Sequence, residues 1–132
     1  MEAILSIELI KKLLKERKLY RHYTIVEAPA LPLGTGTLRE MLGTVHIKHA
    51  TFRNVVAQYL EGFVKAGFTK ILITSVHHGL IHSVAIEEAA MKVMKKYKET
   101  GVRIVSPLNW IVKKIYVDDP KKTWNSITEI LD

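Results

Sequence analysis

Apolar residues recur at helical spacing in three stretches of the chain, which we therefore predict to be helices: residues 2–18, 50–65 and 82–97. In the first stretch the apolar stripe is wider than one neighbour would need. Its members are Ile4, Leu5, Ile7, Leu9, Ile10, Leu13 and Leu14. This width predicts burial on two sides, one of them against another chain. Gly67 follows the second stretch at the place of a C-terminal glycine cap.

Short apolar runs between these stretches predict strands over residues 24–30, 70–76 and 102–106, and a short helix ends the chain. The resulting order is α-β-α-β-α-β-α. Strands that alternate with helices imply right-handed crossovers and a parallel sheet. We therefore expect a single α/β domain over residues 1–132, in which a mostly parallel sheet lies between two layers of helices (a three-layer α/β/α fold).

Composition narrows the classes of protein that need to be considered. The chain has 132 residues and no cysteine, which excludes disulfides, thiolate metal ligands and cysteine nucleophiles. No apolar run approaches the roughly 20 residues of a membrane helix. The first residues lack the pattern of a secretory signal. We expect a cytoplasmic protein with no membrane partner.

The formal net charge is +7, from 20 Lys and Arg against 13 Asp and Glu. Basic residues concentrate in segments 11–18, 92–98 and 113–122. A basic balance is one property of nucleic-acid-binding proteins. Here no nucleic-acid motif is present. We interpret these segments as solvated helix faces and expect no nucleic-acid partner.

Five of the six histidines lie between positions 46 and 82. His46 and His49 follow the first predicted strand, His77 and His78 follow the second, and His82 opens the next helix. Ligands of parallel α/β sheets bind at the carboxyl ends of the strands. We therefore expect these five histidines to converge on one crevice.

Imidazole is a common ligand for zinc and also suits manganese. A catalytic site needs about three protein ligands and one position for a water that becomes the nucleophile. The histidines His77, His46, His49, His78 and His82 are the candidate ligands for such a divalent ion. The alternative is that each is a hydrogen-bonding or capping residue. The sequence contains no P-loop and no complete dinucleotide fingerprint, so we expect no nucleotide cofactor.

Three segments resemble the creatininase (creatinine amidohydrolase) family. Gly43-Thr44-Val45 before a helix is similar to the family's GTI or GTV segment. The block AGFTKILITSVHHG at 66–79 resembles its aliphatic strand followed by NGHGGN, and APALPLG at 28–34 resembles its strand ending in PPIPYG. The resemblance covers about residues 20–110.

The resemblance implies a metal-dependent hydrolase of C–N bonds in small cyclic or formylated amides, with zinc or manganese ions activating a bridging water. It also implies a homo-oligomer, such as a hexamer, and a small-molecule ligand. His77 falls on the family's metal-binding histidine. We expect Gly79, Thr44 and Trp110 to bind the substrate.

The chain also departs from the family pattern. Ser75 and Val76 stand where the family has Asn and Gly, and Leu80 replaces the final Asn. Creatininases proper have a Glu ligand at Gly79. The family's Glu-x-His pair near the N-terminus and GHAGE-type segment near the C-terminus have no counterpart in this sequence.

Three interpretations follow. In the first, the chain is a metallohydrolase with a rebuilt site that is completed across a subunit interface. In the second, it is a non-catalytic small-ligand-binding or assembly subunit. In the third, its basic charge and Gly-Thr loops bind a phosphorylated metabolite without a metal. The missing ligands favour the second interpretation and the excess of histidines favours the first.

Overall fold

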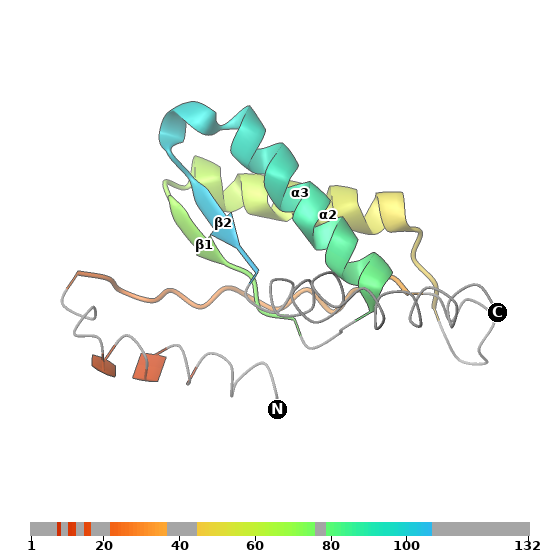
Figure 1. The fold of residues 1–132 in the computed structure, drawn as a ribbon, viewed down its shortest axis with the longest axis horizontal. Coiled ribbons are helices and arrows are strands. Elements are labelled where there is room, and N and C mark those ends of the chain that lie inside the picture. The colour runs from red at the N-terminus through yellow and green to blue at the C-terminus, as the bar shows by residue number, and fades with distance from the viewer. Residues whose placement is uncertain are drawn as a thin grey trace, which may run out of the picture. The chain divides into compact units, whose positions relative to one another are not determined.

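The structure is a computed structural model that describes residues 8, 11–12, 15–16, 22–36, 45–75 and 79–106 (Figure 1). The chain divides into two compact units, residues 1–32 and 33–132. In the first unit, the five described residues of the predicted helix 2–18 are helical. The elements predicted after residue 106 lie outside the described residues.

Two helices of equal length dominate the second unit. Helix α2 spans His49–Lys65 and helix α3 spans Leu80–Lys96, which confirms both predicted helices to within two residues at each end. The helices pack against each other through small and branched side chains. Ala85 and Ala89 have no exposed surface, so α3 contributes little side-chain bulk at these positions.

The C-terminus of α2 has the glycine cap that the sequence predicts. Gly67 has a φ of +94°, a left-handed conformation that a residue with a Cβ rarely adopts. The Gly67 N–H donates to the Val64 carbonyl, and the Phe68 N–H donates to the Phe63 carbonyl. These are the two hydrogen bonds of a Schellman motif. The rings of Phe63 and Phe68 lie edge to face at 6.0 Å and complete the motif with an apolar contact.

Two short strands form a parallel sheet. Strand β1 spans Lys70–Leu72 and strand β2 spans Arg103–Val105, with Ile71 opposite Ile104. Hydrogen bonds from Arg103 N–H to the Thr69 carbonyl and from Ile73 N–H to the Val105 carbonyl extend the pairing at both ends. A short 3-10 helix, η2 (Lys98–Thr100), connects α3 to β2. Because α3 joins two parallel neighbouring strands, the described fold is α/β, as predicted.

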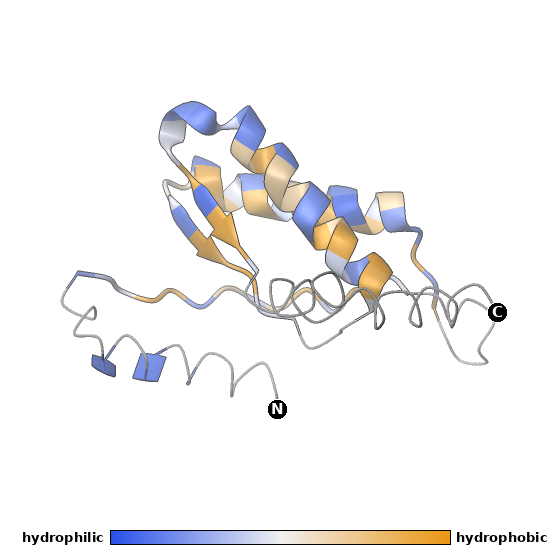
Figure 2. Cartoon of the chain, in the orientation of Figure 1, coloured by the Kyte–Doolittle hydropathy of each residue, from blue (hydrophilic) through white to orange (hydrophobic). Residues whose placement is uncertain are grey.

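The core of this unit lies where α3 packs against α2 and against β2. Figure 2 shows hydrophobic residues on the strands and on parts of both helices. Along β2, Ile104 is buried while Arg103 and Val105 are exposed, so one face of the strand packs toward α3. The buried apolar side chains are Phe52, Val56, Ala57, Leu60, Val64, Ala85, Ile86, Ala89, Ala90, Val93, Val102 and Ile104.

The strand predicted over residues 24–30 does not form. No residue from 23 to 36 is in a helix or a strand, and residues 22–30 are all exposed. Pro29 and Pro32 lack the N–H that a strand ladder requires, which limits pairing of this segment. Short apolar runs therefore predict β1 and β2 correctly but predict a strand at residues 24–30 that is absent.

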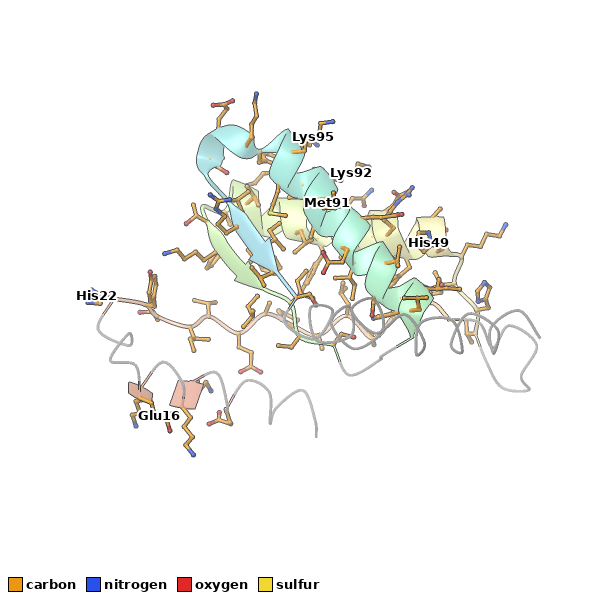
Figure 3. All side chains as sticks on the ribbon, in the orientation of Figure 1. Glu16, His22, His49, Met91, Lys92 and Lys95 are labelled. Carbon is orange, nitrogen blue, oxygen red and sulfur yellow. The ribbon has the colours of Figure 1, made fainter. Side chains whose placement is uncertain are left out.

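The helices of the described part carry charged residues along much of their length. In Figure 3, Met91, Lys92 and Lys95 project from α3. Among the described residues, no helix is long and apolar enough to cross a membrane.

Candidate functional site

Polar side chains meet at the carboxyl end of β1, the sheet edge where the sequence predicts a ligand site. Ser75 lies three residues beyond the end of β1, and His82 lies in the first turn of α3. His82 is only 4% exposed. Buried imidazoles need hydrogen-bond partners, so the contacts of this residue decide what it can do.

Both ring nitrogens of His82 have protein partners. The backbone N–H of Thr35 donates to Nδ1 at 3.4 Å, and Nε2 lies 3.1 Å from the Ser75 hydroxyl oxygen. Since a backbone N–H can only donate, Nδ1 is the acceptor, and we assign the proton of the neutral ring to Nε2. Nε2–H then donates to Ser75. The Phe52 ring stacks on the imidazole at 4.6 Å.

The segment that carries Thr35 is fixed by a second contact. Thr35 is buried, and its hydroxyl donates to the Ile47 carbonyl at 2.8 Å. At the preceding residue, a Cβ on Gly34 would come within 3.4 Å of the His82 ring. A glycine therefore allows this backbone to approach the imidazole closely. We call Thr35, Phe52, Ser75 and His82 the His82 cluster.

A second serine lies near the same edge. Ser106 directly follows β2, and the register pairs Leu72 with Val105, so Ser75 and Ser106 both lie just beyond the paired strands. The Ser106 hydroxyl is buried and has no hydrogen-bond partner among the described residues. A serine hydroxyl thus follows each of the two strands at the carboxyl edge of the sheet.

His49 and His46 are placed differently from His82. His49 is the first residue of α2, and its Nε2 lies 3.8 Å from the Glu88 carboxylate, which also pairs with Arg53 at 3.0 Å (His49 is labelled in Figure 3). His46 is half-buried and precedes the helix. Because α2 begins at His49, the three-residue spacing does not bring these two side chains onto one helical face. His22 is exposed in the other unit.

Several predicted site residues lie outside the described residues: His77, His78, Thr44 and Trp110. His77 and His78 belong to the connection from β1 to α3. Gly79 is described at the end of this connection, half-buried, and its carbonyl accepts the Ser83 N–H in the first turn of α3. Its role in binding a substrate stays a prediction.

The described residues alone do not provide a metal site. Among them, no three His, Asp or Glu side chains lie close enough to hold an ion. Both His82 nitrogens already hydrogen-bond within the protein, and His49 faces Glu88. The predicted zinc or manganese site therefore stays a prediction, and it depends on His77 and His78.

Sequence reasoning missed how His82 is held. From the sequence, Phe52 is only one of the apolar residues of the predicted helix 50–65, and Ser75 is only a departure from the pattern of the family that the chain resembles. Thr35 is 47 positions from His82, so no local pattern predicts their contact. The available signal was the glycine pair around Thr35, which predicts a loop that can approach other groups closely.

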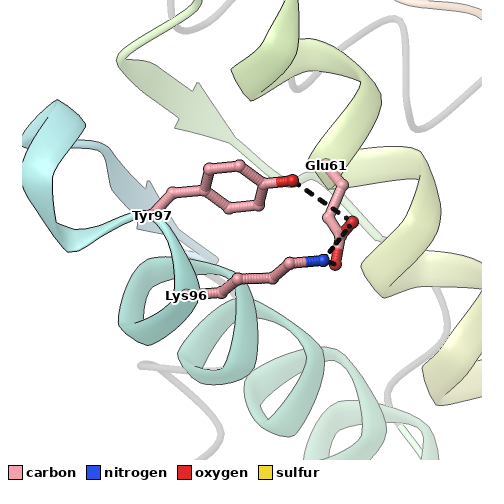
Figure 4. A network of polar contacts seen from close by, with 3 residues as sticks. All are labelled: Glu61, Lys96 and Tyr97. Atoms are coloured by element: carbon pink, nitrogen blue, oxygen red, sulfur yellow. Dashed lines mark hydrogen bonds and ion pairs between the residues drawn. The ribbon is translucent and has the colours of Figure 1, made fainter.

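A polar network joins α2 and α3 near their C-terminal ends (Figure 4). Lys96 Nζ contacts both Glu61 carboxylate oxygens, at 3.0 and 2.9 Å, and the Tyr97 hydroxyl donates to Glu61 at 3.4 Å. The hydrogen bond from Lys96 lowers the pKa of Glu61, and the same bond raises the pKa of Lys96. The network lies at the opposite end of α3 from the His82 cluster, so we assign it to helix pairing.

Comparison with protein families gives one match. The model of the family described as creatinine amidohydrolase matches residues 2–128 of the 132-residue chain. Searches of curated proteins and of solved structures found no match. The family match includes both described helices and both strands.

Proposed function

Because the chain belongs to the creatininase family, we propose that it is a metal-dependent hydrolase of C–N bonds in small cyclic or formylated amides. The family match over residues 2–128 carries this proposal. We also propose that zinc or manganese is the metal and that the protein assembles as a homo-oligomer.

The anchoring of the connection from β1 to α3 supports a role for His77. On one side Ser75 is within hydrogen-bond distance of His82, and on the other α3 begins at Leu80. Only residues 76–79 separate these two points. A ligand within so short a connection loses little conformational freedom when it binds an ion.

The contacts of His82 and His49 narrow the set of ligands. A neutral imidazole has one nitrogen lone pair for a metal, and that of His82 accepts the Thr35 N–H. We therefore assign His82 to positioning, and we propose His77, with His46 and His78, as the ligands. The remaining ligands would come from carboxylates such as Glu40 or from another copy of the chain.

A non-catalytic role, in which the same edge binds a small molecule, is the second candidate. Two observations favour it: Gly79 stands where creatininases proper have a Glu ligand, and two of the five candidate histidines have partners within the protein. A protein that only binds a small molecule requires the polar side chains at this edge of the sheet, but it does not require a metal-activated water.

Elemental analysis of protein without a polyhistidine tag separates these two functions. We expect zinc or manganese in the wild type, loss of the metal in His77→Ala, and full retention in His22→Ala, the matched control at an exposed histidine. A metal-free wild type after growth with both metals would contradict the hydrolase. Metal retained in His77→Ala would contradict the role of His77.

A screen of cyclic amides and formamides then tests catalysis in metal-loaded protein. Turnover that is lost in His77→Ala supports the hydrolase. Ligand binding without turnover, measured by calorimetry on the same compounds, supports the non-catalytic role instead.

A further inference from the structure

We propose that Ser106 is a ligand-binding residue whose hydroxyl hydrogen-bonds an uncharged amide group of a small molecule at the carboxyl edge of the sheet. This inference rests on the proposed function for the place of the ligand, and it holds for the hydrolase and for the non-catalytic protein alike. In the sequence, Ser106 is only the last residue of the predicted strand 102–106.

The Ser106 side chain is buried without a partner. The residue is 6% exposed, and its hydroxyl forms no hydrogen bond within the part of the chain that the structure describes. Thr35 is buried to a similar degree, but its hydroxyl donates to the Ile47 carbonyl. Buried polar atoms are nearly always hydrogen-bonded, because another partner must replace the water that they lose. The Ser106 hydroxyl is therefore a candidate to bind a group from outside the chain.

The burial pattern of β2 shows on which face of the sheet Ser106 lies. Val102, Ile104 and Ser106 are buried at every second position, whereas Arg103 and Val105 are exposed. Alternate side chains of a strand point to the same face. Because β2 packs against α3, this buried face is the one that α3 covers. Ser106 thus lies on the α3 side of the sheet, directly after the end of β2.

Ser75 lies on the same face of the neighbouring strand (β1 and β2 are side by side in Figure 1). The hydrogen bond from Ile73 N–H to the Val105 carbonyl continues the pairing beyond β1, and the register places Ile73 opposite Ser106. Ser75 is two residues further along, and its contact with His82 of α3 places it on the α3 side as well. The two serines thus lie near each other at the edge where parallel α/β sheets bind ligands.

The side chains at this edge favour an uncharged ligand group. Described residues beyond the ends of the two strands, 73–75 and 106, include no charged side chain, and the His82 ring is assigned as neutral. A buried phosphate or carboxylate would require a cationic partner. A hydroxyl can both donate and accept a hydrogen bond, so it can pair with the carbonyl or with the N–H of an amide. A cyclic amide or a formamide therefore suits this edge.

Ser106→Ala separates a ligand-binding hydroxyl from a structural one. Loss of an unpartnered hydroxyl should leave the urea midpoint of the free protein unchanged or raise it, whereas the Kd for hydantoin, a cyclic amide, should rise about fivefold. NMR titration of the nitrogen-15-labelled full chain with zinc present measures this Kd. Thr69→Val is the matched control, because it removes an exposed hydroxyl at the amino end of β1 and should leave the Kd unchanged.

An unchanged Kd in Ser106→Ala, or a raised Kd that accompanies a lowered urea midpoint, would assign the hydroxyl to the fold and overturn the proposal. A wild type that binds inorganic phosphate and not hydantoin would overturn the uncharged class of ligand.

The same variant distinguishes failure of this proposal from failure of the hydrolase. Hydantoin that binds without turnover, and more weakly to Ser106→Ala, supports the role of Ser106 and contradicts the hydrolase. Turnover with an unchanged KM in Ser106→Ala supports the hydrolase and contradicts the role of Ser106. If both proposals hold, Ser106→Ala raises KM, whereas His77→Ala abolishes turnover.

Discussion

Replacement of His82 by Phe tests whether the hydrogen bonds of the His82 cluster, rather than its bulk, hold the carboxyl edge of the sheet together. Phe keeps a ring of similar size, so the stack on Phe52 at 4.6 Å is preserved. It removes both nitrogens. The backbone N–H of Thr35 then loses its acceptor, and the Ser75 hydroxyl loses its donor.

The two losses differ in size because the two partners differ in burial. Thr35 is 4% exposed, so water cannot easily replace the lost acceptor, and an unsatisfied buried donor costs about 1–3 kcal/mol. The bond is long, at 3.4 Å, which favours the low end of that range. Ser75 is half-buried, and its lost bond costs about 0.5–1.5 kcal/mol. We expect His82→Phe to lower the free energy of unfolding by about 2 kcal/mol.

Urea denaturation measures this change directly. With a slope of about 2 kcal/mol/M, the midpoint should fall by about 1 M. His22→Phe is the matched control: it makes the same substitution at an exposed position, where a change within about 0.5 kcal/mol is expected. If the two variants unfold at the same urea concentration, the hydrogen bonds of His82 do not stabilise this edge.

The two glycines of α2 and its cap should respond to alanine with opposite signs. Gly67→Ala places a Cβ on a residue in a left-handed conformation and should destabilise the protein by about 1 kcal/mol. Gly62→Ala, in an exposed helical turn with open space around it, should stabilise the protein by about 0.5–1 kcal/mol. Urea denaturation measures both changes, and a change of the same sign in the two variants would contradict the Schellman assignment. Because folding lowers the pKa of Glu61, its ionised carboxylate stabilises the folded state at pH values above the ordinary carboxyl pKa. This stabilisation is lost as the pH falls through the lower pKa of the folded state. The melting temperature of Glu61→Gln should therefore fall less between pH 7 and pH 3 than that of the wild type, and parallel pH profiles would refute this. Because folding raises the pKa of Lys96 above the ordinary value of 10.5, its charge stabilises the folded state until the pH rises through the raised pKa. The melting temperature of Lys96→Met should therefore change less than that of the wild type as the pH rises through this range.

Local patterns predicted the parts of the fold that local interactions determine. The apolar periodicity of α2 and α3 is confirmed to within two residues, because each helix buries one face in the core. Gly67 was predicted as a cap from its position alone, since few other residues accept its backbone conformation. The apolar run at residues 24–30 predicts a strand that does not form, because a strand also requires a partner strand and free N–H groups, and Pro29 has no N–H.

The candidate site was only partly predictable. The sequence indicates a ligand site at the carboxyl end of β1, because parallel α/β topology places ligands there, and His82 lies near this end. The convergence of the five histidines on one crevice stays a prediction. The sequence could not predict that the His82 nitrogens are already engaged by Thr35 and Ser75, since these contacts depend on how distant segments pack. His82 is thus a candidate metal ligand from the sequence, whereas its contacts in the structure indicate a positioning residue.

The bond between Thr35 and His82 also has a consequence for the order of folding. It closes a loop of 47 residues that contains all of α2 and β1, whereas the hydrogen bonds within the helices join residues four apart. Contacts with a large sequence separation carry a greater entropic cost of closure and tend to form after local structure. We therefore expect the two helices to form first and the carboxyl edge to assemble last. Amide hydrogens around Thr35 should accordingly exchange with solvent sooner than those in the centre of α3.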